Sequence, residues 1–228
     1  MPSMQSAYRK HLSTEIALLQ VINDVLRTEY CRQELVLLLL DLSAAFDTLD
    51  HTILLDRLSR YLGFSHTVLR WFSSYLTGRI QSVTITQHLA VQRLERGIPQ
   101  GSILGPLLFI LYTAPVQDII SAHNLDCMFY ADDSQLYKTI DPHDQSPALN
   151  TLQKCISEFI EWNTINKLVC NPRKTEVIQF SSRFAENPIL SDFLIGNVRV
   201  QPSDRVCNLI VNLDHPNLIL MKHAKRLC

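Results

Sequence analysis

The chain of 228 residues has only six glycines, and its basic and acidic residues almost cancel. So few glycines exclude a Gly-rich linker or a fibrous protein, and an apolar content of 46% argues against disorder of the whole chain. The 21 basic and 22 acidic residues give a formal net charge of −1. Free-standing nucleic-acid binders usually carry a basic excess. Near-neutrality therefore counts against strong autonomous binding to nucleic acid, but it allows an enzyme whose acidic site offsets basic residues elsewhere.

Neither a zinc motif nor a long apolar segment is evident. No two of the six cysteines have C-x-x-C spacing, so zinc is not indicated. The first residues are polar and do not resemble a signal peptide. The longest apolar runs, Leu35–Leu40 and Ile103–Tyr112, are too short to span a bilayer. We therefore expect no membrane partner, an intracellular location in the nucleus or cytoplasm, and cysteines that are core residues or free thiols.

Apolar residues at three- and four-residue spacing predict five helices. They are expected from Thr14 onward, over 51–62 after an Asp50 cap, over 66–76, from Ile103 through Ile120 after Ser102, and from Ser146 onward. The first helix is expected to present Ile16, Leu19, Ile22 and Leu26 on one apolar face. Gly63 and Gly78 end the second and third helices. Pro115 predicts a kink or break in the fourth.

Several short segments are typical of strands. Leu35–Leu40 is a continuous apolar run, as in a strand that is buried on both faces. Further strands are expected over 82–86, 175–180, 193–195, 197–200 and 206–213. Cys127–Tyr130 and Ser134–Tyr137 flank a hairpin turn. The mixture of helices with non-local strands indicates the α+β class.

Three aspartates are candidate metal ligands. Asp41 follows the buried strand, where a lone carboxylate is costly without a partner or a metal, although a helix cap or turn residue is an alternative. Asp132 and Asp133 place two like charges in a hairpin turn that has no glycine, an arrangement expected where function overrides local preference. Together the three could hold two divalent cations for phosphoryl transfer, and hard oxygen ligands favour Mg²⁺ or Mn²⁺. The alternative for the pair is a solvated acidic turn.

A glycine-flanked loop, Gly97-Ile-Pro-Gln-Gly101, precedes the fourth helix. Glycine allows a backbone to approach a ligand closely, and a helix N-terminus favours negatively charged groups. An ordinary loop before a capped helix is the alternative.

Five short sequence blocks closely resemble, in their order and their residues, those of the reverse transcriptase of LINE-type, non-LTR retrotransposons. The resemblance covers roughly residues 5–180. The blocks are Gln5–Glu15, Leu39–Asp47, Gly97–Phe109, Phe129–Asp133 and Asn171–Glu176. In the family they correspond to the late fingers, the first catalytic block, the template and nucleotide block, the paired-Asp block and the late-palm lysine block.

The resemblance implies an RNA-directed DNA polymerase that uses Mg²⁺ or Mn²⁺, deoxynucleoside triphosphates, an RNA template and a DNA primer. It implies that Asp41, Asp132 and Asp133 hold the catalytic metals, and that Lys174 approaches the triphosphate and protonates the leaving group. Phe46 would sit under the sugar, Gln100 and Gly101 would contact nucleotide and template, and Tyr130 would lie against the primer end. Plain structural alternatives are a core aromatic for Phe46 and a solvated lysine for Lys174. Asp47 is expected to be structural, at a helix cap.

The resemblance also predicts a domain layout and its gaps. We expect partial fingers over 1–34, a reverse-transcriptase palm with the catalytic site over 35–182, and a degenerate end of the palm or start of the thumb over 183–228. Earlier fingers strands, a full thumb and the endonuclease of many relatives are expected to be missing, and Ile210 stands where relatives have glycine. A catalytically inactive remnant, or a nucleic-acid-binding module that keeps the palm, is therefore the main alternative function. A different two-metal enzyme, such as a nuclease, would leave Phe46 and the Gln100 block without a role.

Overall fold

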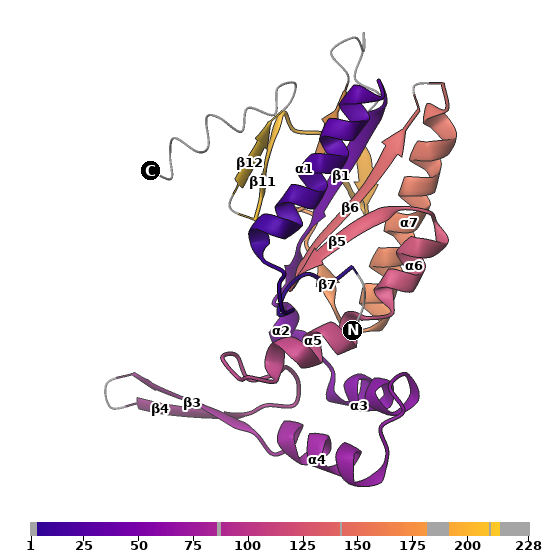
Figure 1. Ribbon diagram of the computed structural model, residues 1–228. Helices are drawn as coiled ribbons and strands as arrows, with labels where there is room; N and C mark the ends of the chain where they lie inside the picture. The colour runs from indigo at the N-terminus through magenta and orange to yellow at the C-terminus, as the bar shows by residue number, and fades with distance from the viewer. Residues whose placement is uncertain (1–3, 86–87, 142, 182–191, 210, 215–228) are drawn as a thin grey trace.

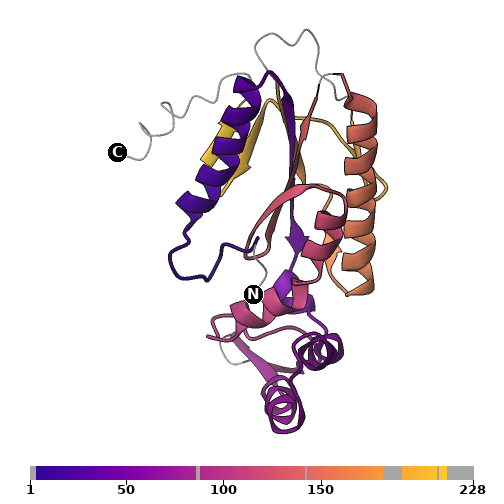
Figure 2. The ribbon, with the colours of Figure 1, turned by 45° about the vertical axis from the view of Figure 1, so that its right-hand side comes forward.

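A four-stranded antiparallel sheet lies between two layers of helices in the computed structural model (Figures 1 and 2). The structure describes residues 4–85, 88–141, 143–181, 192–209 and 211–214. The sheet has the strand order β5-β6-β1-β8, with β5 Asp126–Tyr130, β6 Asp133–Ile140, β1 Glu34–Leu40 and β8 Glu176–Phe180. Helix α1 (Thr14–Tyr30) covers one face, whereas α6 (Val116–Ala122) and α7 (Gln145–Ile165) cover the other. This arrangement confirms the α+β class.

The apolar run of β1 supplies the centre of the fold. Its residues contribute alternately to two cores, because successive side chains of a strand point to opposite faces. Leu35 and Leu37 pack with α1, and Val36, Leu38 and Leu40 pack with α6 and α7. All five side chains are buried, so the predicted strand with two buried faces is confirmed.

The apolar face predicted for α1 is wrong. Ile16, Leu19 and Leu26 are 38%, 61% and 46% exposed, whereas Ala17, Val21 and Val25 are buried against the sheet. Apolar residues occur around much of this helix, so more than one face could have been buried. The face that packs on the sheet carries the smaller apolar side chains. Ile22 is the predicted residue that does lie in the core.

A separate lobe, the α3–β4 lobe (residues 51–93), lies below the sheet in Figure 1. It contains α3 (His51–Arg60), α4 (His66–Leu76), β3 (Ile80–Ile85) and β4 (His88–Arg93), and the short helix α2 (Ala45–Thr48) leads into it. Asp50 caps α3 as predicted: its Oδ1 accepts from the amides of Thr52 (2.9 Å) and Ile53 (3.1 Å). The strand β4, which completes a hairpin with β3, was not predicted.

Within the described part of the chain, one helical segment, Gly105–Ala122, is apolar and long enough, by length and composition alone, to cross a membrane. It contains the two helices α5 (Gly105–Thr113) and α6, separated at Ala114-Pro115 as Pro115 predicted. Leu108, Phe109 and Tyr112 of α5 are at most 1% exposed within a core shared with α3 and α4. A helix buried in a protein core can be as long and apolar as a membrane-spanning helix. The packing of α5 in this core accounts for its apolar sequence.

Two small hairpins follow β8. Strands β9 (Phe193–Ile195) and β10 (Val198–Val200) pack beside α7, and β11 (Arg205–Asn208) pairs with β12 (Val211–Asp214) on the side of α1. The single strand predicted over 206–213 is thus a hairpin. Ile210 and Cys228 lie outside the described residues, and the five described cysteines are free thiols.

Candidate active site

The pairing of β1 with β6 brings Asp41 and the Asp132-Asp133 pair to one end of the sheet. Leu40 pairs with Ser134, so the next residues along the two strands, Asp41 and Asp133, face each other across the end of the ladder. Asp132 lies in the two-residue turn of the β5–β6 hairpin, because Tyr130 pairs with Asp133. The predicted hairpin around this pair is therefore present.

The turn has an unfavourable backbone conformation that a distant side chain stabilises. Ala131 has φ +57°, a region that non-glycine residues seldom adopt. The Ala131 amide donates to Gln5 Oε1 (3.2 Å), and Gln5 Nε2 donates to the Ala131 carbonyl (3.4 Å). The Ser6 amide also donates to the carbonyl of Phe129 (2.8 Å). Gln5 is 3% exposed, so a buried side-chain amide stabilises the turn through its two hydrogen bonds to Ala131. The sequence placed Gln5 in a matching block but gave it no role.

The electrostatics of this end of the sheet reflect three close carboxylates. The pKa of Asp133 is raised above its ordinary value, first by desolvation and then by the charges of Asp132 and Asp41, although its side chain still reaches solvent. The pKa of Tyr8 is raised as well, by burial and then by the charge of Asp132. The residues following Gln5 thus also lie near the paired aspartates.

A turn after α7 brings Lys174 to Asp41. The amide of Asn171 donates to the Asp41 carbonyl (2.9 Å), and the Thr175 hydroxyl donates to the Asn171 carbonyl (2.9 Å). Lys174 Nζ consequently lies 3.8 Å from Asp41 Oδ2. Asp41, Asp133 and Lys174 line one cavity of about 200 Å³. Glu176, Asn208 and other residues at the ends of β1, β6, β8 and β11 complete its lining.

The residue types at this cavity fit a divalent cation. Asp41 Oδ2 is buried and has no hydrogen-bond partner within the described part of the chain, and Lys174 is beyond hydrogen-bond distance. Carboxylate oxygens are the ligands that Mg²⁺ and Mn²⁺ prefer. Nevertheless, among the described residues no group of three or more His, Cys, Asp or Glu side chains is arranged to hold a metal ion. Asp41 and Asp133 line the cavity, and Asp132 is not among its lining residues.

Backbone hydrogen bonds join the loop Gly97–Gly101 to the segment that follows Asp41. The amides of Gly97 and Ile98 donate to the carbonyls of Leu49 and Phe46, both at 2.8 Å. A Cβ at Gly97 would lie 2.8 Å from the Asp47 carbonyl oxygen, which explains the glycine. Ser102 Oγ accepts from the Gly105 amide (3.0 Å), although α5 begins two residues later than predicted.

Gln100 donates to both carboxylate oxygens of Asp47, at 3.0 and 3.1 Å, so both side chains are placed by one exposed contact. The helix cap predicted for Asp47 is wrong: Asp47 lies inside α2, and the cap residue is Ala44, with φ 47° and no side-chain bond. The structural role of Asp47 is therefore to hold Gln100. Gly101 has φ +77° and open space around it.

The remaining predicted site residues are aromatic. Phe46 stacks on Phe109 of α5, with ring centroids 4.7 Å apart, and is only partly buried. Tyr130 is likewise half-buried, at the edge of the core beneath α1. Tyr130 adjoins the turn that carries Asp132, whereas Phe46 and Gln100 are placed by the segment between Asp41 and α3.

Sequence reasoning missed a buried amide pair behind the carboxylates. Gln135 Nε2 donates to Asn208 Oδ1 (2.6 Å), and Asn208 Nδ2 donates to Gln135 Oε1 (2.8 Å). Glu176 Oε2 accepts from the Cys207 amide (3.1 Å). These bonds fix the β11–β12 hairpin beside the cavity. Their partners are far apart in sequence, so no local pattern could reveal them.

The chain is similar to known proteins over most of its length. The family model described as "Reverse transcriptase (RNA-dependent DNA polymerase)" matches residues 1–205. The chain is 29% identical to a probable RNA-directed DNA polymerase from transposon X-element of Drosophila melanogaster, over 79% of this chain and 20% of that protein. It is 28% identical to the RNA-directed DNA polymerase from mobile element jockey of Drosophila funebris, over 82% of this chain and 21% of that protein. The chain thus spans about a fifth of the length of these relatives.

Solved structures with the same fold include telomerases. The telomerase of Candida albicans, in complex with a fragment of telomeric RNA, superposes with a TM-score of 0.58 and 16% identity over 98% of this chain and 39% of that one. Apo telomerase of Candida tropicalis gives 0.56 and 14% over 92% and 41%. At this identity the likeness shows the fold alone. With the family model matching most of its length, the chain belongs to the reverse transcriptase (RNA-dependent DNA polymerase) family.

Proposed function

We propose that this chain is the core of a retrotransposon RNA-directed DNA polymerase, which transfers deoxynucleotides from deoxynucleoside triphosphates to the 3′-hydroxyl of a DNA primer on an RNA template and releases pyrophosphate. The observation that carries the proposal is the strand register that places Asp41 opposite Asp133, next to Asp132 in the hairpin turn. Membership of the family supports the reaction class.

In this proposal Asp41, Asp132 and Asp133 hold Mg²⁺ or Mn²⁺. The cations would neutralise the carboxylates, favour attack by the 3′-hydroxyl and stabilise the leaving pyrophosphate. Asp41 Oδ2, which accepts no hydrogen bond from the described residues, is open to a cation. The pKa of Asp133 is raised first by desolvation and then by Asp132 and Asp41, so a nearby positive charge would stabilise its carboxylate. Asp132 would turn toward the cavity when the cations bind.

The other residues would position substrates. Lys174, 3.8 Å from Asp41, would move to the triphosphate and donate a proton to the leaving group once a cation replaces it. Phe46 would lie under the sugar of the nucleotide, and its stacking on Phe109 would hold the Phe46 ring in position. Gln100 and Gly101 would contact the nucleotide and template, and Tyr130 the primer end. The Asp47 carboxylate would orient Gln100.

The proposed domain layout follows the same assignment, with fingers residues over 1–34, the palm over 35–182, and the end of the palm or start of the thumb over 183–228. Residues 182–191 and 215–228 lie outside the described ranges. One observation favours the alternative of a palm without activity: the three aspartates do not form a ready metal-binding group among the described residues.

A primer-extension assay tests the proposal. Oligo(dT) annealed to poly(rA) would be incubated with dTTP and Mg²⁺, using the wild-type chain, Asp132→Asn and the control Asp118→Asn. Asp118 is an exposed acid of α6 outside the cavity. We expect extension by wild type and the control and none by Asp132→Asn. Equal signals from wild type and Asp132→Asn would remove the polymerase proposal for this chain.

A further inference from the structure

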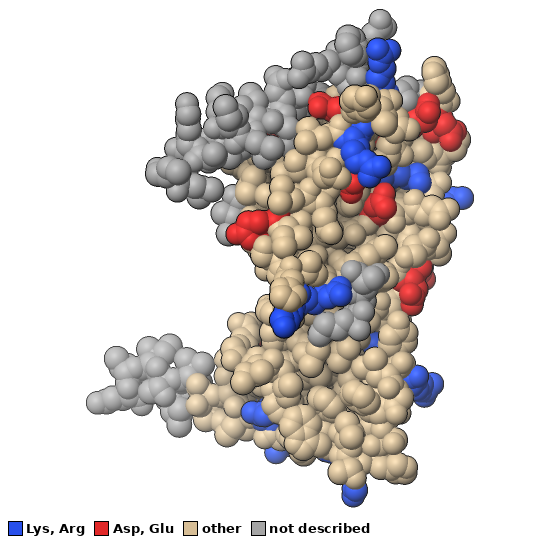
Figure 3. Space-filling view, viewed as in Figure 1, with Lys and Arg blue, Asp and Glu red and all other residues tan. Residues whose placement is uncertain are grey.

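The acidic residues are unevenly distributed along this nearly neutral chain. Between Arg57 and Leu94 there is no aspartate or glutamate, although the chain has 22 acidic residues in total. The same segment contains five arginines: Arg57, Arg60, Arg70, Arg79 and Arg93. It makes up most of the α3–β4 lobe, and the face of this lobe drawn in Figure 3 displays basic side chains and no acidic ones. The lobe therefore has a local positive charge that the net charge conceals.

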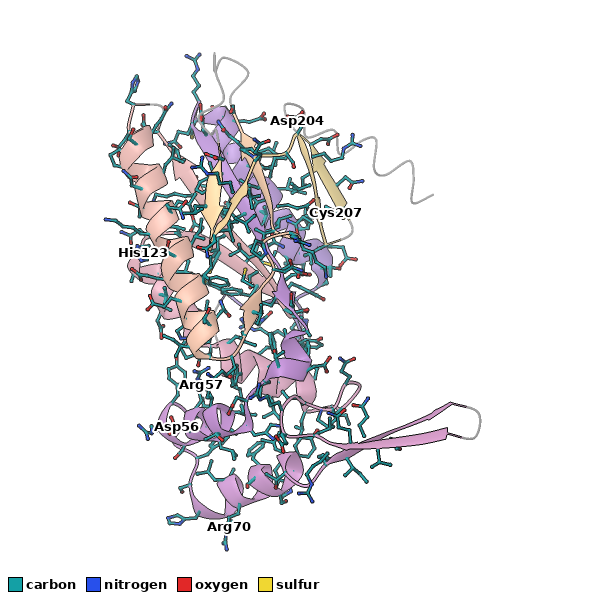
Figure 4. The ribbon with its side chains drawn as sticks, turned by 180° about the vertical axis from the view of Figure 1, so that it is seen from behind. Asp56, Arg57, Arg70, His123, Asp204 and Cys207 are labelled. Carbon is teal, nitrogen blue, oxygen red and sulfur yellow. The ribbon has the colours of Figure 1, made fainter. Side chains whose placement is uncertain are left out.

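Arg57 and Arg60 each have polar partners within the protein, as do Arg70, which donates to Thr67 Oγ1 (3.4 Å), and Arg79. Arg57 donates to the Tyr112 carbonyl and to Asn166 Oδ1 (2.6 Å) and is largely enclosed. Arg60 pairs with Asp56 at 2.6 Å. Arg70, Arg79 and Arg93 are on the surface, and Figure 4 shows Arg70 projecting from α4 away from the rest of the molecule. The surface charge thus lies on α4 and the base of the β3–β4 hairpin.

Aromatic rings on α4 are stacked with one of these arginines. The rings of Trp71 and Tyr75 are nearly parallel, at 10°, with centroids 5.8 Å apart. The guanidinium of Arg79 lies 4.7 Å from the centroid of the Tyr75 ring, and its Nε donates to the Tyr75 carbonyl (2.8 Å). Trp71, Tyr75 and Arg79 recur every four residues and form a ladder, which we call the Trp71–Arg79 ladder.

The ladder presents planar groups to solvent. Trp71 is 52% exposed, and Val68 on the preceding turn is 45% exposed. The neighbouring hairpin adds Ile80 and Val91, 66% and 56% exposed. Since isolated two-stranded hairpins are marginally stable in water, such an exposed apolar ribbon is typical of a surface that a partner covers. The arginines and the absence of acidic residues indicate a partner that is negatively charged.

From this geometry we propose that the Trp71–Arg79 ladder binds single-stranded RNA, with bases stacking on Trp71 and Arg79 and phosphates near Arg70 and Arg93. Aromatic platforms combined with a basic surface are how proteins hold single strands without sequence preference, and arginine planes also stack on bases. Duplex nucleic acid does not expose base faces. The choice of RNA rests on the proposed function, in which the unpaired strand is the RNA template.

A binding assay without divalent cations separates this proposal from catalysis. Fluorescence anisotropy of labelled oligouridine would be followed for the full chain and for Trp71→Ala, Trp71→Phe and Arg79→Gln. Matched controls are Tyr30→Ala, an aromatic 91% exposed on α1, and Arg60→Gln, the arginine paired with Asp56. Oligothymidine and an RNA duplex of equal length serve as competing probes, and circular dichroism confirms that each variant is folded.

We expect Trp71→Ala and Arg79→Gln to weaken oligouridine binding by about tenfold each, since stacking is worth about that per base. Trp71→Phe should retain most of the affinity, and both controls should bind as wild type does. Equal losses in Trp71→Ala and Tyr30→Ala, tighter binding of the duplex, or tighter binding of oligothymidine than of oligouridine would overturn the proposal. Because no metal or nucleotide is present, failure of primer extension would leave this result unaffected, and the reverse also holds.

Discussion

At the residue scale, the conformation of the Asp132 turn depends on Gln5, which is 126 positions away in the sequence from Ala131. A hairpin turn of Ala and Asp lacks the glycine or asparagine that tolerates a positive φ. The buried Gln5 amide satisfies both backbone groups of Ala131 and thereby compensates for that strain. The orientation of the aspartate pair is thus set by the segment before α1 as well as by its own strands.

We predict that Gln5→Leu destabilises the fold by about 1 kcal/mol, because it leaves the partly buried Ala131 amide without its hydrogen-bond partner. It should also weaken divalent-cation binding by loosening the Asp132 turn. Gln153→Leu is a matched control, since Gln153 makes the same two bonds to the Leu194 backbone at the surface. Urea denaturation and a Mn²⁺ titration would measure both effects. Equal Mn²⁺ affinity for the two variants would refute the role of Gln5.

A second residue-scale prediction concerns Glu34, which is 3% exposed and accepts from Gln179 Nε2 at 2.9 Å. Desolvation raises its pKa above the ordinary 4.5, against the smaller effect of the Gln179 bond. A carboxyl group with a raised pKa takes up its proton more readily in the folded state. Its contribution to stability is therefore present below the ordinary pKa and is lost as pH rises through the raised pKa.

Glu34→Gln keeps an acceptor for Gln179 and removes the charge. We predict that the variant is more stable than wild type at neutral pH and that this advantage disappears below pH ~4, near the unfolded pKa of glutamate. Thermal or urea denaturation of both proteins over a pH series measures the difference. A difference that does not change with pH would contradict the prediction.

At the element scale, the backbone of the loop Gly97–Gly101 packs directly against the backbone of α2. Its glycine-flanked sequence suggested a loop that approaches a ligand closely, whereas the close approach at Gly97 is to the Asp47 backbone. Since Gln100 is bound to Asp47 as well, the loop and the segment after Asp41 form one structural element. A change in the loop should therefore alter the position of Phe46.

Gly97→Ala tests this coupling. A Cβ would lie 2.8 Å from the Asp47 carbonyl oxygen at φ +83°, whereas Gly63, at φ +72°, has open space around it. Both alanines incur the strain of a positive φ, so Gly63→Ala is the control. We predict that Gly97→Ala costs about 1–3 kcal/mol more than Gly63→Ala, the usual range for overpacking. Chemical denaturation measures both, and equal costs would contradict the close packing of the loop.

The starts and ends of several helices follow from local sequence. The Asp50 side chain caps α3, whereas Gly63 and Pro115 act through their own backbone, so these boundaries could be read from the sequence. Not every local signal was right, because Asp47 does not cap a helix. The face of α1 is chosen by the sheet opposite, and the sequence alone does not contain that information. The hairpin partner β4 was missed because no clear turn signal in the sequence separates it from β3.

At the scale of the whole molecule, the sequence predicted candidate residues for the site but not how they are arranged. The buried run of β1 ending at Asp41, and the hairpin carrying Asp132 and Asp133, could each be inferred locally. Their register, and the turn that brings Lys174 to Asp41, appear only in the folded chain. The positive α3–β4 lobe was likewise hidden by a net charge of −1.

Mn²⁺ binding, measured by electron paramagnetic resonance, would show whether the three aspartates form one cation site. We predict that Asp41→Asn and Asp133→Asn each weaken Mn²⁺ binding by about tenfold or more, as loss of groups around a metal commonly does, while Asp118→Asn binds as wild type does. Unchanged Mn²⁺ affinity in Asp41→Asn and Asp133→Asn would show that these aspartates do not form a cation site.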